Sequence, residues 1–349
     1  MRAFLDGTTW GLFLILCCGT VAAADDAGRL EEILSTMRSR QEEARTFIAE
    51  WDEGAGAEDG ARGGRTIRLT LGTEGRMLLE SSPAGEVAFG QAGPMKSSYD
   101  GRRNRQFTAA VGKDDWPRGI VWDDAVYDEL RAAEIQVWLL HLRPFHEPFP
   151  DLGNGPLQVV EQNVLIDGQP CLLVERPALD GGSYVERYWI DVDRACIVRT
   201  EHRDGKRLLS GRTVRYRPDE RLGWLPESWE SGFSNGSNAL RARLIRHELN
   251  PDVPDETFAF DFPVGTVVFD RDRGLRHLVL ADGRTRDITP EESASGFDYH
   301  ALAESSAGDL APQLEASGDE WTPSTIVLLV ANLLLVVVGV VFWVLRRGE

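Results

Sequence analysis

The feature that most constrains this chain is an apolar run near its end, from Ile326 to Leu345, which reads IVLLVANLLLVVVGVVFWVL. The run is about 20 residues long and uncharged, which matches the hydrocarbon thickness of a bilayer. A helix buried in a soluble domain would show a polar stripe, and this run shows none. Trp343 suits a membrane interface, and Arg346 and Arg347 follow directly. The run predicts one membrane-spanning helix; the alternative is a core helix of a large domain.

The beginning of the chain predicts export. A short apolar core from Trp10 to Cys18 is followed by small residues at Ala22 to Ala24, and then by Asp25. This pattern is typical of a secretory signal peptide that is cut after Ala23 or Ala24, whereas an uncleaved anchor would need a longer apolar run. Export at the front and arginines after the last span agree with each other. We therefore expect most of the chain outside the cytoplasm and the tail inside.

Composition limits the partners and the chemistry. The net charge of −18 disfavours nucleic acid and leaves no broad basic face for anionic headgroups. The sequence has no phosphate loop, no dinucleotide fingerprint and no C-x-x-C pair. His141 and His146 lack the spacing of a helical zinc pair, so a structural role is favoured for both. We expect no nucleic-acid partner, no cofactor and no metal.

Two cysteines remain after removal of a signal peptide, Cys171 and Cys196, in a compartment that permits a disulfide. Each begins an apolar segment that predicts a strand, CLLVER or CIVRT. If these strands are neighbours, the two cysteines can pair. If a third strand separates them, they lie about 10 Å apart, which is too far for a bridge. The sequence leaves both alternatives open.

Periodicity predicts an exported domain that is mostly β, with two helices. Helical spacing of apolar residues predicts a helix from Asp26 to about Glu43 and another from Asp123 to Leu142. The first strand is expected from Thr46 onward. Asp-Gly and Asn-Gly turn signals about every ten residues predict an antiparallel meander in the second half. The segment 255–274 is expected to close this meander, and Asp282-Gly283 to form a last hairpin.

These features divide the chain into five parts. They are a signal peptide at residues 1–24, an exported domain at 25–289, an acidic tether at 290–322, a transmembrane helix at 323–345 and a cytoplasmic tail at 346–349. The tether is expected to be disordered because small and acidic residues dominate it and it contains no Lys or Arg.

One short motif suggests an enzyme and has a simpler explanation. Gly232 to Gly236 matches G-x-S-x-G, in which Ser234 would be the nucleophile. A nucleophile elbow needs a strand before it and a helix after it. Here Ala239 to Glu248 alternates as a strand, and Asn235-Gly236 is typical of a hairpin turn. We therefore expect a hairpin rather than a serine hydrolase, and no enzymatic activity.

Several segments resemble one bacterial family. They are the opening LEEILSTMRSRQEEARTFIAEW, the hairpin SSYDGRRNRQF, and the closing GWLPESW and RARLIRHELNPDVPDETFAFDFPVGTVV. Together they resemble the LolA/LolB-type lipoprotein-carrier superfamily, which includes RseB-like sensors, over roughly Ala27 to Asp270. The resemblance implies an unclosed antiparallel half-barrel covered by helices, with an apolar concave face that holds acyl chains. The carriers' Arg-Pro pair is absent from RTIRLTLGTEGR, and the carriers travel freely, whereas this chain has a predicted anchor.

The resemblance implies a membrane-anchored, periplasmic binding protein of the bacterial cell membrane, acting as a local carrier or an envelope sensor. Its partners would be lipid or lipoprotein acyl chains, the membrane through the C-terminal helix, and a membrane protein. Six side chains are expected to line the cavity, namely Phe47, Trp51, Leu69, Leu71, Trp138 and Leu142. The alternatives are a structural or interaction domain, in which the same side chains fill a closed core, and a hydrolase at Ser234.

Overall fold

The structure is a computed structural model of the chain, and its description covers defined segments. These are residues 27–55, 64–84, 93–110, 116–123, 129–146, 152–153, 155–177, 182–233 and 240–289, with 292, 299 and 303. The predicted signal peptide, transmembrane helix and tail lie outside them, as does Ser234. Within the described segments, no helix combines the length and the apolar character needed to cross a membrane.

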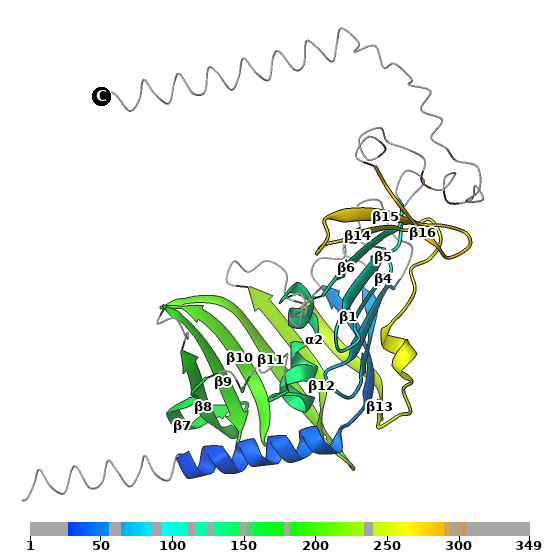
Figure 1. Cartoon of the computed structure of the whole chain (residues 1–349). Coiled ribbons are helices and arrows are strands. Elements are labelled where there is room, and N and C mark those ends of the chain that lie inside the picture. Colours follow the sequence, from blue (N-terminus) through cyan, green and yellow to red (C-terminus); the bar gives the residue numbers. More distant parts are fainter. Residues whose placement is uncertain are drawn as a thin grey trace, which may run out of the picture. The chain divides into compact units, whose positions relative to one another are not determined.

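The described strands form one unclosed sheet, which curves around its inner face (Figure 1). Its order is β16-β15-β14-β6-β5-β4-β3-β2-β1-β13-β12-β11-β10-β9-β8-β7. The first group is β1 (Phe47–Ala55), β2 (Arg65–Leu71), β3 (Met77–Pro83), β4 (Met95–Tyr99), β5 (Asn104–Thr108) and β6 (Arg118–Trp122). The second is β7 (Gln158–Ile166), β8 (Gln169–Pro177), β9 (Tyr184–Asp191), β10 (Cys196–Asp204), β11 (Arg207–Asp219), β12 (Gly223–Phe233) and β13 (Leu240–Leu249). The third is β14 (Val267–Asp270), β15 (Leu275–Val279) and β16 (Thr285–Asp287).

The sheet consists of two meanders that meet at its centre. The first runs outward from β1 to β6, and the second starts at the far edge with β7 and returns to β13. There β13 pairs antiparallel with β1, from Phe47 opposite Leu249 to Ala55 opposite Leu240. The alternation that predicted the first strand is confirmed, because Phe47, Ala49 and Trp51 are buried on one face.

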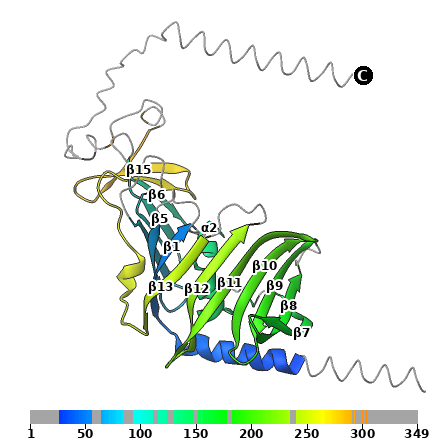
Figure 2. The same cartoon turned by 180° about the vertical axis from the view of Figure 1, so that it is seen from behind.

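Two helices cover the inner face of the sheet (Figures 1 and 2). The N-terminal helix spans residues 27–43, as its apolar spacing predicts, and packs through Leu30, Ile33, Leu34 and Met37 on strands β8 to β10. Helix α2 (Glu129–Leu142) packs on the central strands. Leu140 of α2 joins the core under the N-terminal helix, whereas Trp138 and Leu142 join the central core. Helix α2 therefore lies between two apolar clusters.

The expectation that residues 255–274 close the meander is wrong in two respects. Asp255–Phe258 forms a short 3₁₀ helix, η1, and the strand that follows pairs parallel with β6, with Val267 opposite Arg118. The intervening segment crosses the face opposite the core. A Cβ on Gly72 would lie 2.7 Å from the Phe258 ring, and a Cβ on Gly119 would lie 2.7 Å from the Phe262 ring. Phe258 and Phe262 therefore anchor a strap across the sheet, and this carries the chain to its far edge.

The folded unit continues past residue 289. Tyr299 and Ala303 are buried in a small cluster with Leu278, Leu280 and Ile288. The Tyr299 ring packs edge-on against Trp116 at 5.4 Å. The boundary expected between residues 289 and 290 therefore does not coincide with the end of the packing, because described residues of the expected tether lie against β14 to β16.

A capping box fixes the start of this extension. The Thr289 amide donates to the Glu292 carboxylate at 2.9 Å, and the Glu292 amide donates to the Thr289 hydroxyl at 3.2 Å. This reciprocal pair satisfies backbone donors that a helix start leaves free. Arg286 of β16 also donates through two nitrogens to Glu292, at 2.9 Å each. Glu292 thus ties the extension to the last strand.

Candidate functional site

The six side chains predicted to line a cavity come together between the sheet and α2. Phe47 and Trp51 extend from β1, Leu69 and Leu71 from β2, and Trp138 and Leu142 from α2. Each of the six is 3% exposed or less. The Trp138 ring lies 5.2 Å from the Phe47 ring and 6.1 Å from the Trp51 ring. The predicted convergence is therefore present, and the side chains pack against one another.

Trp229 of β12 completes this cluster and was not predicted. Its ring lies 5.6 Å from Trp51 and 5.8 Å from Trp138, so three indoles are in mutual contact. Trp229 lies in a segment expected to form part of a hairpin, but its partners come from distant parts of the chain. The indole nitrogens of Trp51 and Trp138 are buried and have no acceptor among the described residues. A buried donor without a partner destabilises the fold by about 1–3 kcal/mol.

A second apolar region is open to solvent, between the N-terminal helix and the edge of the sheet. It is a groove of about 490 Å³, within the range of about 300–1,000 Å³ that is typical of small-molecule sites. Its apolar lining comes from the helix, the segment after α2, and β7, namely from Leu30, Leu34, Phe145, Leu152, Leu157 and Val159. Leu30 and Leu34 were predicted as the apolar face of the helix, whereas the segment after α2 showed no periodicity.

A charged pair lies at the rim of this groove. The guanidinium of Arg38 lies 4.9 Å above the Phe145 ring and 2.6 Å from the Glu31 carboxylate. Both charged side chains are largely solvent-exposed, so this ion pair contributes little to stability. Their polar ends beside an apolar lining give the groove an amphipathic entrance. This arrangement suits a ligand with an apolar chain and a polar head.

Buried polar groups fix the two helices to the sheet. Arg40 donates to the carbonyl oxygens of Ala195 at 3.0 Å and Arg194 at 3.1 Å. Its Nη1 also lies 3.4 Å from Nδ1 of His141, and the other ring nitrogen of His141 lies 2.9 Å from the carbonyl of Trp224. Burial, and then the charge of Arg40, hold the pKa of His141 well below its ordinary value of 6.5. The neutral ring then accepts from Arg40 and donates to Trp224.

The two cysteines do not form a disulfide. Cys171 and Cys196 are free buried thiols, and β9 lies between β8 and β10, so both cysteines have Asp191 as their register partner. The intervening strand separates their backbones by about two strand spacings, beyond the reach of a disulfide. Burial raises the pKa of each thiol to about 11, which makes them unreactive structural groups.

The motif around Ser234 lies between two antiparallel strands. Strand β12 ends at Phe233, strand β13 begins at Leu240, and Ser231 pairs with Leu240. Ser234 itself lies outside the described residues. A strand on both sides is the arrangement of a hairpin and differs from the strand–turn–helix of a nucleophile elbow.

No protein-family model matches the sequence, and no curated protein matches it. Similar solved structures include a DUF1329 family protein from Desulfovibrio piger, with a TM-score of 0.46 and 12% identity over 67% of this chain and 96% of the other. A putative outer membrane lipoprotein-sorting protein domain from Vibrio parahaemolyticus has a TM-score of 0.45 and 14% identity over 65% and 94% of the chains. A LolA superfamily protein from Nitrosomonas europaea has a TM-score of 0.44 and 14% identity over 64% and 96%.

Proposed function

We propose that this chain is an extracytoplasmic binding protein that holds an acyl chain of a lipid or lipoprotein. It acts beside the bacterial cell membrane, anchored by its C-terminal helix, as a local carrier or an envelope sensor with a membrane-protein partner. The observation that supports this most directly is the apolar groove under the N-terminal helix. Exposed apolar hollows of this size are often ligand sites.

The groove favours an acyl chain over a compact polar ligand. Six of its lining residues are aliphatic or aromatic, and the two charged ones, Glu31 and Arg38, are largely solvent-exposed. Transfer of each CH₂ group from water into such a lining contributes about 0.8 kcal/mol. A chain of many methylenes therefore gains affinity from the walls while its polar head stays near Arg38.

The six predicted side chains form the second part of the proposed site. Helix α2 contributes Trp138 and Leu142 to their cluster and Leu140 to the cluster beside the groove. The half-barrel therefore has apolar surface on two sides of one helix. A ligand that displaces α2 meets both surfaces, and the unpaired indole donors of Trp51 and Trp138 then face its acceptor oxygens. The tight packing of the cluster supports the alternative of a closed core.

Two neighbouring valines of β7 give a matched test of the groove. Val159 lines it, whereas Val160 is 49% exposed on the same strand and is not among the lining residues. We expect the exported part, ending at Glu304 and freed of lipid, to bind a fluorescent fatty-acyl probe in a titration. Val159→Asp should weaken binding about tenfold or more, because it places a charge in the apolar lining.

Val160→Asp is the control and should leave the affinity unchanged. Both variants should retain cooperative melting by circular dichroism, because neither valine is fully buried. A lipid-free wild type that folds cooperatively but binds no acyl probe would show that the groove is not an acyl site. Equal weakening by both substitutions would place the probe elsewhere on β7.

A further inference from the structure

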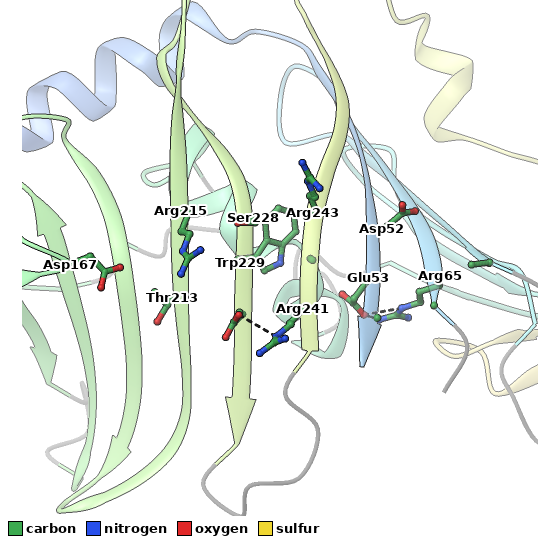
Figure 3. Close-up of a pocket in the computed structure, with 15 residues that line it drawn as sticks. Asp52, Glu53, Arg65, Asp167, Thr213, Arg215, Ser228, Trp229, Arg241 and Arg243 are labelled. Carbon is green, nitrogen blue, oxygen red and sulfur yellow. Dashed lines mark hydrogen bonds and ion pairs between the residues drawn. The ribbon is translucent and has the colours of Figure 1, made fainter. Parts of the chain in front are cut away.

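A second and larger hollow lies on the outer face of the sheet (Figure 3). Trp51, Trp229 and Ala242 point into the central core. Because side chains alternate along a strand, the neighbouring residues of these strands point to the opposite face. This outer groove has a volume of about 720 Å³, and β1, β11, β12 and β13 supply most of its lining. It is separate from the apolar groove under the N-terminal helix.

Three acidic residues of the outer groove already have partners. Glu53 accepts from Arg65 at 2.9 Å, and Glu230 pairs with Arg241 at 3.2 Å (Figure 3). Asp52 accepts from the hydroxyl of Thr66 at 2.8 Å. Asp167, from the turn between β7 and β8, lies at the other side of the groove (Figure 3). Three of the four acidic residues that line the groove therefore already have a partner.

Two arginines in the middle of the groove have no such partner. Arg215 of β11 and Arg243 of β13 are exposed, and within the described residues neither forms an ion pair or a hydrogen bond through its side chain. Both are register partners of Ser228 on β12, the strand between them. Thr213 adds a second hydroxyl on β11. The guanidinium groups of Arg215 and Arg243, neither of which is paired within the described residues, thus lie on the two strands that flank Ser228.

We propose that this outer groove binds a phosphate group, carried by a lipid headgroup or by a free phosphate compound. Arginine presents its donors in a planar fork that matches phosphate oxygens. The resulting charge-assisted hydrogen bonds are stronger than hydrogen bonds between neutral groups. A phosphate offers three acceptor oxygens, enough for both guanidinium groups and a hydroxyl at once. A carboxylate offers only two oxygens, so phosphate is the better match to donors on three strands.

The net charge of the chain is −18, so a site that binds an anion needs a local excess of positive charge. An acidic protein repels anions over most of its surface, and only a local excess of free guanidinium groups holds one. Asp52 is the register partner of Arg243, and Glu230 lies on β12 between the two arginine-bearing strands. Asp52 accepts from Thr66 and Glu230 pairs with Arg241, and neither carboxylate is paired with Arg215 or Arg243, which leaves the two arginines available.

The test is a calorimetric titration of the full chain in a neutral detergent at low salt. The probes are inorganic phosphate, glycerol 3-phosphate and acetate. We expect both phosphates to bind more tightly than acetate. Arg215→Gln and Arg243→Gln should each weaken phosphate binding about tenfold, because each removes a charge-assisted contact. Tighter binding of glycerol 3-phosphate than of inorganic phosphate indicates a headgroup, and the reverse indicates a free phosphate compound.

Arg217→Gln is the matched control, because Arg217 is exposed on the same strand as Arg215 and is not among the groove residues. It should leave phosphate affinity unchanged, and all three variants should melt at the wild-type temperature. A wild type that binds no phosphate, acetate binding as tight as phosphate binding, or an equal loss in Arg217→Gln would each overturn the proposal. The acyl-probe result bears on the other groove and does not affect this outcome.

Discussion

Nη1 of Arg40 lies 3.4 Å from Nδ1 of His141, in the interior where the N-terminal helix meets α2. The contact requires a neutral imidazole, because a protonated ring would direct a second positive charge at the guanidinium. The pKa of His141 is lowered by burial and then by Arg40, from an ordinary 6.5. Well above pH 6.5 the ring is neutral in both the folded and the unfolded chain.

Below pH 6.5 the unfolded chain takes up a proton at His141 that the folded chain does not. The free energy of unfolding should therefore fall as the pH decreases below about 6.5. Thermal melting of the wild type and of His141→Gln at several pH values between 5 and 8 checks this. Glutamine is neutral throughout and should flatten the dependence. Parallel profiles for the two proteins would assign the pH effect to other groups.

Trp138 distinguishes a packed core from a loosely filled cavity. Its indole is fully buried against Phe47, Trp51 and Trp229. Because these contacts are complete, Trp138→Ala should lower the free energy of unfolding by about 3–5 kcal/mol in a denaturant titration. Trp138→Phe should lower it much less, since it keeps a ring and removes an N–H without an acceptor. A loss below about 1 kcal/mol for Trp138→Ala would indicate a cavity wall.

The strap across the sheet requires glycine at two positions. Gly72→Ala and Gly119→Ala should each lower stability by about 1–3 kcal/mol, because the new methyl group would overlap the ring of Phe258 or Phe262. Gly232→Ala is the control, since a Cβ there meets nothing within 4 Å. Melting temperatures measure all three. If all three alanine variants melt together, the strap does not pack as closely as described.

The end of the folded domain is testable by truncation. A chain that ends at Thr289 lacks Glu292, Tyr299 and Ala303, and so exposes the cluster with Leu278 and loses the ion pair with Arg286. We expect it to melt at a lower temperature than a chain that ends at Glu304. Calorimetry of the two truncated proteins makes the comparison. Equal melting temperatures would restore a domain boundary at residue 289.

The cysteines should be unreactive in the folded protein. Burial raises the pKa of Cys171 and Cys196 to about 11, so few thiolates form at pH 8 and no reagent reaches them. A thiol assay of a chain that begins at Asp25, and so holds only Cys171 and Cys196, should give almost no colour under native conditions and two thiols per chain in guanidinium chloride. Absence of both thiols after unfolding, with recovery on reduction, would reveal a disulfide.

Local features of the fold were readable from the sequence, and long-range ones were not. The segment RTIRLTL alternates in sequence and forms β2 (Arg65–Leu71), and Asp100-Gly101, within the hairpin SSYDGRRNRQF, turns between β4 and β5. Both signals come from residues within one strand or one turn, because the alternation of side chains and the turn-forming residues determine local structure without distant contacts. The segment 255–262 also alternates, with Phe258, Phe260 and Phe262 at even spacing, yet it forms a strap whose contacts lie on distant strands.

In the candidate sites, too, local features were predictable from the sequence and long-range contacts were not. Alternation placed Phe47 and Trp51 on one face of a strand, and helical spacing placed Trp138 on the apolar face of a helix. The resemblance to a half-barrel then predicted that they would converge, as they do in the central core. The sequence did not reveal that Arg40 and His141 are buried together, since 101 residues separate them. The Thr289-Pro290-Glu291-Glu292 capping box was a local signal that composition obscured, because the acidic stretch around it favoured disorder.

The junction between β1 and β13 has a consequence for how the chain reaches its folded state. Glu50 and Arg246 face each other across it and are 196 residues apart in the sequence. While the chain emerges, β1 presents free backbone groups on that side until nearly the whole domain has followed it. An unpaired edge of this kind readily pairs with another chain. Newly made molecules therefore need protection from one another during that interval, and a holding chaperone acting on the first meander would raise the yield of folded protein.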